Sequence, residues 1–479
     1  MIKEDYEMKK LIAGLLCGCM IAVSLGGCGK APAAKEGGDS NAASGTQKSA
    51  GEEAKKSDAA SGAKVLRVWS FTDEVPKMID KYKELHPDFD YEIETTVIAT
   101  TDGAYQPALD QALAAGGTDA PDIYCAEAAF VLKYTQGDAS RYAAPYEDLG
   151  IDPGKVKESE IAQYAVDIGT NTEGKVVGLG YQATGGAFIY RRSIAKDTWG
   201  TDDPKEVAAK IGAGTGSWDQ FYKAAEELKT KGYGIVSGDG DIWHAVENSS
   251  DQGWIVDGKL NIDPKREAFL DLSKQLKDNG YHNDTQDWQD AWFADMKGEG
   301  AKPVLGFFGP AWLINYTMAP NCGGAAVGEG TFGDWAVCDS PIGFFWGGTW
   351  VLGNKDTAHK EAVADILEWI TLDSSETGLQ YMWANGTMNE AGTKDAVASG
   401  TVMAKSDGSV EFLGGQNMFE VFVPANQFAN GTNLTQYDET INTFWRGQVR
   451  EYTAGNKSRE QALADFKQQV ADNLDIIVE

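Results

Sequence analysis

Apolar residues from position 64 onward alternate between short continuous runs and segments in which they recur every three or four residues. The first pattern predicts buried strands and the second predicts amphipathic helices. In the first part of the chain we expect strands at 65–69, 91–99 and 121–125, and helices at 75–85, 106–115 and 128–134. Strands that alternate with helices predict an α/β fold in which helices cover both faces of a parallel sheet.

A second series of the same patterns begins near position 176. Ser217 is the expected N-cap of a long amphipathic helix. We expect strands at 187–190 and 303–308, and helices at 218–231, 266–279, 359–372, 375–383, 437–452 and 458–474. The chain from 64 to 479 is too long for one compact core, so the repeated pattern predicts two lobes or domains.

The first 28 residues have the order of a secretory signal. Two lysines precede an apolar run at 11–25, and small residues then precede Cys28. This order resembles the lipobox of bacterial lipoproteins, which implies that residues 1–27 are removed and that Cys28 is lipidated. The alternative is an uncleaved anchor with an incidental cysteine. Both place the protein on the extracellular side of the cell membrane, joined to its anchor by a disordered tether at 28–63, which is rich in Ala, Gly, Ser and Lys.

The charge of the chain argues against binding to nucleic acid or to anionic membrane surfaces. Its formal net charge is −30 at pH 7. A strongly negative protein repels phosphate backbones and anionic lipid, so we expect no nucleic acid partner and contact with the membrane only through the lipid anchor. No apolar stretch after the signal is long enough to span a bilayer.

The cysteines and histidines give little support to a metal site. Cys125 lies in an apolar run, which predicts a buried free thiol. The separation of Cys322 and Cys338 suits a local disulfide worth about 3 kcal/mol, and two unpaired thiols are the alternative. The four histidines are scattered and no CxxC pair occurs. We therefore expect neither a metal nor a cofactor.

Fourteen tryptophans are the main candidates for ligand contacts. Trp218, Trp335 and Trp369 lie in helical or strand-like apolar patterns and are expected in the core. Others stand at element ends or in Gly-rich and polar stretches, where loops carry binding residues: Trp69, Trp243, Trp254, Trp288, Trp292, Trp312, Trp346, Trp350 and Trp383. An indole face suits the apolar face of a sugar ring, although each of these residues can also belong to the core.

Carboxylates accompany several of these tryptophans. Asp73 and Glu74 follow the first strand, and Glu127 follows the third, at the ends where open α/β sheets bind ligands. Asp239 and Asp241 precede Trp243, but ordinary turn chemistry or a calcium loop can also explain them. The predicted ligand-binding set is Trp69, Asp73, Glu74, Glu127, Trp243, Trp288, Trp292, Trp312, Trp346, Trp350 and Trp383.

Several local motifs follow one another in a specific order. They are Phe308-Gly309-Pro310-Ala311-Trp312, Gly333-Asp334-Trp335-Ala336-Val337, Gly347-Gly348, Asp373-Ser374-Ser375-Glu376 and Gly455-Asn456-Lys457-Ser458. With the lipobox and the α/β pattern, they resemble the extracellular solute-binding proteins of carbohydrate ABC importers, the family that includes maltose-binding protein.

The resemblance implies a two-lobed periplasmic-binding-protein-like fold with hinge strands and an interlobe ligand cleft. Lobe one would comprise 64–180 and 346–395, and lobe two would comprise 181–345 and 396–479. Closure around a carbohydrate, with several aromatic subsites favouring an oligosaccharide, would precede delivery to the ABC permease subunits. We expect a monomer without enzymatic activity.

Three rival functions remain open from the sequence. A secreted glycosidase would need two carboxylates about 5–10 Å apart across the scissile bond, and no pattern singles out such a pair. The same fold could bind a polyamine or a metal chelate, because acidic and aromatic walls also suit a cation. A surface adhesin would need no closing cleft.

Overall fold

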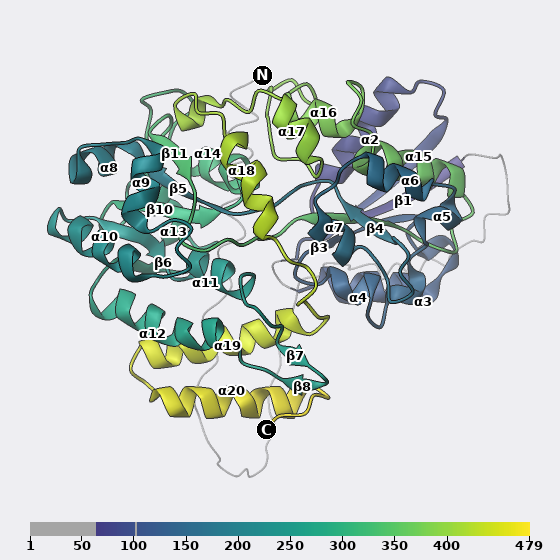
Figure 1. The fold of residues 1–479 in the computed structure, drawn as a ribbon. Coiled ribbons are helices and arrows are strands. Elements are labelled where there is room, and N and C mark those ends of the chain that lie inside the picture. Colours follow the sequence, from purple (N-terminus) through teal and green to yellow (C-terminus); the bar gives the residue numbers. More distant parts are fainter. Residues whose placement is uncertain (1–63, 101–102) are drawn as a thin grey trace, which may run out of the picture. The chain divides into compact units, whose positions relative to one another are not determined.

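The computed structural model describes residues 64–100 and 103–479, shown in Figure 1. The predicted signal, Cys28 and the tether lie outside the described residues. The chain from residue 64 onward belongs to one compact unit. None of the helices within the described ranges is long and apolar enough to cross a membrane.

The first predicted strand and helix form as the pattern indicates. In β1 (Lys64–Ser70), alternate side chains such as Leu66 and Val68 are buried. In α2 (Glu74–Leu85), the buried residues follow helical spacing, from Val75 to Tyr82. The chain leaves the helix at His86, directly before Pro87, because a residue that precedes proline disfavours the helical conformation.

Sheet one has the strand order β2-β1-β3-β12-β4. Its other strands are β2 (Tyr91–Val97), β3 (Ile123–Glu127), β4 (Gly178–Gly180) and β12 (Thr349–Gly353). Strand β1 runs parallel to β2 and β3, but β12 runs antiparallel to β3 and β4. The prediction of a purely parallel sheet is therefore wrong. Strand β12 joins the sheet late in the chain, after the whole of sheet two, and is not tied to the direction of the βαβ units.

Sheet two has the strand order β11-β5-β10-β6-β9. Its strands are β5 (Ala187–Arg191), β6 (Gly234–Gly238), β9 (His282–Thr285), β10 (Val304–Gly309) and β11 (Trp335–Cys338). Strands β10, β6 and β9 run parallel, and β5 is antiparallel to both β10 and β11. The carboxyl ends of β10, β6 and β9 consequently lie at one edge of the sheet.

Each sheet carries its own helices and its own hydrophobic core. We call the part built on sheet one lobe one, with helices α2, α3 (Tyr105–Ala115), α4 (Val131–Thr135), α5 (Tyr146–Leu149), α6 (Pro153–Glu158), α7 (Gln163–Ile168), α15 (Lys360–Thr371) and α16 (Leu379–Ala384). The predicted helix at 375–383 is shorter than expected.

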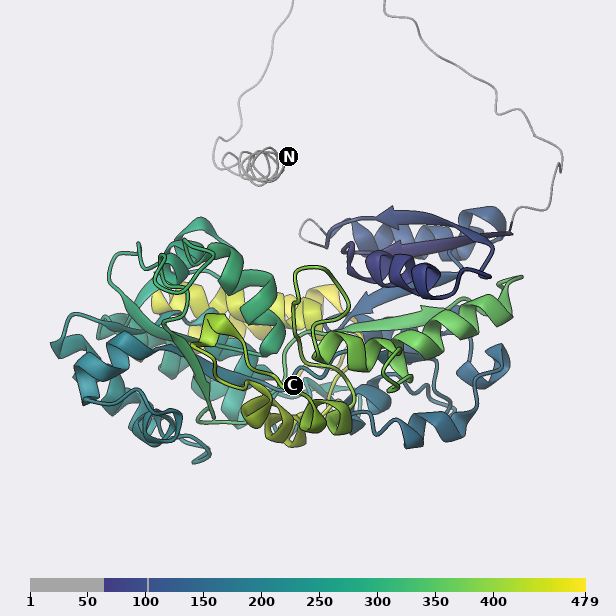
Figure 2. The same cartoon turned by 90° about the horizontal axis from the view of Figure 1, so that it is seen from above.

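We call the part built on sheet two lobe two. Its helices are α8 (Arg192–Trp199), α9 (Pro204–Ile211), α10 (Asp219–Thr230), α11 (Gly240–Glu247), α12 (Pro264–Asp278), α13 (Asp290–Lys297), α14 (Ala319–Asn321), α17 (Gly400–Lys405), α18 (Phe419–Ala425), α19 (Asp438–Thr453) and α20 (Arg459–Asn473). A two-stranded sheet of β7 (Ile255–Val256) and β8 (Lys259–Leu260) precedes α12. Helix α19 packs against α12 and α20 (Figure 1), and Figure 2 shows the yellow C-terminal helices beside the teal elements of lobe two. The residue limits predicted for the lobes stay predictions.

Three segments of the chain cross between the lobes, at 181–186, 339–348 and 385–399. The first two run side by side in opposite directions, because the N–H of Gly186 donates to the carbonyl of Phe344 at 2.9 Å and the N–H of Trp346 donates to that of Thr184 at 3.1 Å. The third joins them where the N–H of Ala398 donates to the carbonyl of Tyr181 at 2.8 Å. The resemblance predicts hinge strands without giving their residue limits, and these three segments make the connection between the lobes.

Three predictions about individual residues meet different outcomes. Trp335 and Trp369 are buried, as expected. Ser217 is not the N-cap of α10, since the helix starts one residue later, after Trp218. Of the two alternatives for Cys322 and Cys338, the structure shows separate, buried free thiols and no disulfide, and Cys125 is a buried free thiol as predicted. Cys338 belongs to strand β11, whereas the Cys322 thiol donates to the carbonyl of Ala319 at 3.0 Å.

Candidate functional site

Three parallel strands of lobe two deliver functional side chains to one edge of sheet two. Strand β6 ends at Gly238 and leads into α11, which carries His244. Strand β9 ends shortly before Trp288, and β10 ends shortly before Trp312. The crossing segment 339–348 supplies Trp346. We call His244, Trp288, Trp312 and Trp346 the aromatic group.

The rings of the aromatic group are in mutual contact. His244 stacks on Trp346 with ring centroids 3.9 Å apart and an interplanar angle of 10°. Trp312 meets Trp346 edge-on at 4.8 Å, and its indole N–H donates to the carbonyl of Trp346 at 3.0 Å. Trp288 is parallel to Trp312 at 6.2 Å and lies 6.3 Å from Trp346. Four elements thus build one aromatic surface.

Trp288 is the most solvent-accessible member of this surface. Its side chain is 43% exposed, and its backbone has a φ of 65°. A bulky residue in the left-handed region costs on the order of 1–3 kcal/mol and is found mainly at functional sites. The exposed ring and the strained backbone together make Trp288 a candidate for contact with a ligand.

Acidic side chains hold His244 in its charged form. Its Nε2 lies 3.1 Å from Asp287 and its Nδ1 lies 3.7 Å from Glu247. Burial lowers the pKa of His244, but the hydrogen bonds and charges of these two carboxylates outweigh burial and raise it to about 9. At neutral pH an imidazolium therefore lies against the face of Trp346, a favourable cation–π arrangement.

A second ion pair supports the same helix from behind. Arg446 on α19 donates to Asp239, which precedes α11, at 2.8 Å. Burial raises the pKa of Asp239, but Arg446 and Ser273 outweigh it, so the pKa is below its ordinary value. Asp239 is therefore a structural ion-pair partner of α19, and Asp241 is a buried residue whose carboxylate accepts from the indole N–H of Trp292 at 3.2 Å.

Lobe one contributes Glu127 at the carboxyl end of β3. One carboxylate oxygen accepts from the N–H of Ala129 at 2.8 Å. Burial raises the pKa of Glu127 to about 7, with further increases from Glu439 and Glu247 and an opposing effect of His244. The carboxylate of Glu127 in lobe one is therefore coupled electrostatically to charged residues of lobe two.

A second set of acidic residues lies near the third crossing segment. Glu74 accepts a short hydrogen bond from the hydroxyl of Tyr181. Burial, then the charge of Asp73, raise the pKa of Glu74 to about 6, and burial followed by the charge of Glu74 raises that of Asp395 to about 7. Partial burial, followed by the charges of Glu74 and Asp73 of lobe one, raises the pKa of Tyr316 in lobe two.

Most of the folded chain matches a known protein family. The family model described as bacterial extracellular solute-binding protein matches residues 69–377, which is more than half of the chain. The chain belongs to this family. No curated protein sequence matches it. The family resemblance found in the sequence and the predicted two-lobed fold are therefore confirmed.

Solved structures resemble this solute-binding protein along most of its length. An extracellular solute-binding protein of family 1 is 19% identical, with a TM-score of 0.69, over 85% of this chain and 99% of the other. The galacto-N-biose/lacto-N-biose I-binding protein of an ABC transporter from Bifidobacterium longum is 17% identical, with a TM-score of 0.65, over 88% and 100%. The sugar-binding protein MalE from Xanthomonas citri is 14% identical, with a TM-score of 0.63, over 85% and 96%.

The structure brings part of the predicted binding set together. Trp288, Trp312 and Trp346 belong to the aromatic group with His244. Glu127 of lobe one interacts electrostatically with His244. Asp73 and Glu74 belong to the second acidic set. Trp383 also lies there, since its ring is 6.1 Å from that of Tyr181.

Four predicted tryptophans have other positions. Trp243 is 2% exposed and packs among Trp254, Phe269 and Trp445 in the core of lobe two. Trp292 and Trp350 are also buried, although Trp292 supports Trp288 at a ring distance of 5.4 Å. Trp69 lines a separate groove between β1, β2 and α3. We do not include these four in the proposed site.

Sequence reasoning missed the charged residues around the aromatic group. His244 follows a predicted tryptophan directly, but a scattered histidine carries no spacing signal for stacking. Glu247 is one helical turn further along α11, a spacing that predicts the pair with His244 once the helix is known. Glu439 and Arg446 come from α19, roughly two hundred residues later. Only the fold brings them close.

Proposed function

We propose that this solute-binding protein captures a carbohydrate, specifically an oligosaccharide, between its two lobes and delivers it to the permease of an ABC transporter. The observation that carries the proposal is the aromatic group, in which three tryptophans from different elements lie within 4.8–6.3 Å of one another. Flat indole faces suit sugar rings, and the adjacent carboxylates can accept hydroxyl hydrogen bonds.

The proposal places the protein at the cell surface. Lipidation of Cys28 and the tether at 28–63 would hold it on the extracellular face of the membrane, where the permease lies. Membership of the extracellular family and the order of residues 9–28 support this location. Metabolic labelling with a palmitate analogue tests it, because Cys28→Ser should abolish both the label and membrane retention.

One observation favours a second candidate, a cationic solute such as a polyamine. Burial, followed by the charges of Glu439 and Glu247 of lobe two, raises the pKa of Glu127 of lobe one, and His244, whose charge opposes this effect, is already paired with Asp287. An ammonium group would compensate these carboxylates and could also contact the indole faces.

A thermal-shift screen separates the two candidates. The soluble chain from residue 64 is tested against mono- and oligosaccharides and polyamines, because a ligand that binds only the native state raises the melting temperature. A shift with an oligosaccharide supports the proposal, and a shift with polyamines alone overturns it. Release of reducing ends from the same oligosaccharides would instead indicate a glycosidase.

A further inference from the structure

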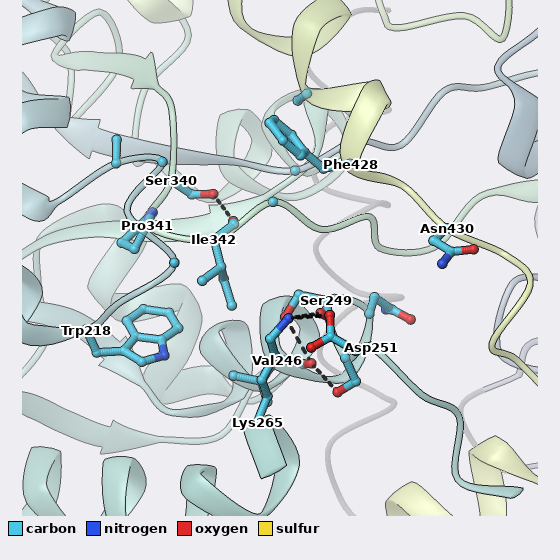
Figure 3. Close-up of a pocket in the computed structure, with 18 of the residues that line it drawn as sticks. Trp218, Val246, Ser249, Asp251, Lys265, Ser340, Pro341, Ile342, Phe428 and Asn430 are labelled. Atoms are coloured by element: carbon cyan, nitrogen blue, oxygen red, sulfur yellow. Dashed lines mark hydrogen bonds and ion pairs between the residues drawn. The ribbon is translucent and has the colours of Figure 1, made fainter. Parts of the chain in front are cut away.

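A cavity of about 830 Å³ lies in lobe two, and no member of the aromatic group lines it. Its wall includes the end of α11 with the following loop (246–251), the start of α12 (264–272), the crossing segment at 339–343 and the segment 424–430 (Figure 3). This volume is within the range of about 300–1,000 Å³ typical of sites for small molecules.

The wall presents apolar rings from different parts of the chain. Trp218 precedes α10 and is backed by Phe221 at 5.3 Å and Phe308 at 5.9 Å. Phe428 is 54% exposed and lies directly over Gly343, where a Cβ would come within 2.3 Å of its side chain. Figure 3 shows Trp218 and Phe428 on different sides of the cavity, with Ile342 between them.

The charges of the wall are largely satisfied by the protein itself. The Lys265 ammonium lies 2.9 Å from Asp251 and donates to the carbonyl of Ser249 at 2.8 Å. Asp339, the remaining charged residue of the wall, is solvent-exposed. Because a paired ammonium has little attraction left for an anion, and Asp339 adds a negative charge, the cavity does not favour an anionic ligand.

Neutral polar side chains complete the lining. Asn248, Gln427 and Asn430 carry amide groups at the cavity. Ring surfaces for apolar faces, combined with amides for hydroxyl groups, match the amphipathic character of a sugar ring. We propose that this cavity is a second ligand site, which binds a neutral disaccharide. The proposal does not depend on what the aromatic group binds.

Helix α11 and the crossing segment 339–348 each contribute residues to both the aromatic group and the cavity. Helix α11 has His244 in the aromatic group and Val246 at the cavity, and the crossing segment has Trp346 in the aromatic group and Ile342 at the cavity. Residues two apart on a helix face different directions, so α11 separates the two places. A ligand in the cavity thus contacts the elements that position the His244–Trp346 stack.

Hydrogen–deuterium exchange locates the binding. Maltose, cellobiose and lactose are the probes, with benzyl alcohol as an aromatic probe that is not a saccharide. Ala268 is exposed on α12 and lines the cavity, so Ala268→Trp fills the site without disturbing the core. Ala464→Trp is the matched control, because Ala464 is an exposed alanine of α20 outside the cavity.

We expect at least one disaccharide, at ten times its Kd, to slow exchange in 246–251 and 424–430 by about ten-fold. The effect should persist in Trp288→Ala and Ala464→Trp and disappear in Ala268→Trp. The proposal is overturned if no disaccharide protects these segments, if benzyl alcohol alone does, or if Ala268→Trp is protected like the parent. Failure of the proposed function is a separate result. It would be seen as no slowing of exchange by oligosaccharides at 286–292 and 312–318, the segments that carry Trp288 and Trp312.

Discussion

Replacement of Trp288 by alanine tests the aromatic group most directly. The side chain is 43% exposed, and its ring lies 6.2 Å from Trp312 and 6.3 Å from Trp346. The variant removes the accessible part of the aromatic surface and leaves the two more buried tryptophans in place. We therefore expect a loss of solute affinity with little loss of stability.

The size of the effect follows from the exposed area. An aromatic side chain of up to about 250 Å² that is 43% exposed offers about 110 Å² to a ligand. A sugar that covers one face, about half of this area, gains about 1.4 kcal/mol at about 25 cal/mol per Å². This corresponds to a loss of about ten-fold in affinity, and complete coverage corresponds to about a hundred-fold loss.

Titration calorimetry with the solute found by thermal shift measures this loss. Trp199→Ala is the control, since Trp199 lies on α8 and its indole N–H donates to Glu227 at 2.6 Å, away from the aromatic group. The free energy of unfolding of Trp288→Ala should stay within about 1 kcal/mol of the parent, because the residue is exposed and its backbone is strained. Unchanged affinity, or a large fall in stability, would refute the reasoning.

Three further predictions concern stability and chemistry. Trp243→Ala should lower the free energy of unfolding by about 3–5 kcal/mol, because it empties a core position, and urea denaturation measures this. A denatured fragment of residues 64–479 should titrate three thiols with or without prior reduction, and extra thiols after reduction would contradict the structure. The raised pKa of His244, about 9, stabilises the fold below about pH 6.5. This contribution to the free energy of unfolding, at most about 3 kcal/mol, should be lost as the pH rises through about 9. Denaturation curves measured across this pH range should show the loss in the parent and not in His244→Asn.

The strand and helix pattern predicted much of the fold because local signals are strong there. Strand β1 and helix α2 agree with their predicted positions to within one residue. The pattern also predicted β10, which Trp312 follows, but it did not predict the short strand β9, which precedes Trp288. The direction of β12 was not predictable, because a short apolar run gives no sign of whether its neighbours in the sheet run parallel or antiparallel to it.

The sequence could not show which tryptophans belong to the core and which to the aromatic group, and the reason is geometric. Trp243 and His244 are neighbours on α11, and successive residues of a helix point about 100° apart. Trp243 packs into the core with Trp254, whereas His244 stacks on Trp346. Which of the two faces the core depends on the rotation of α11, and Asp239 with its partner Arg446 from α19 contributes to fixing it.

The electrostatics between the lobes indicate how a solute favours their approach. Burial and the nearby Glu439 and Glu247 raise the pKa of Glu127 to about 7, so ionised Glu127 opposes the contact between lobes. We infer that hydroxyl groups donating to Glu127 and Glu247 reduce this opposition, since a hydrogen bond to a charged group contributes about 1.5–3 kcal/mol. A solute that donates hydrogen bonds to carboxylates of both lobes at once would bind the closed arrangement better than the open one. This difference in affinity is what a ligand needs to shift the equilibrium toward closure.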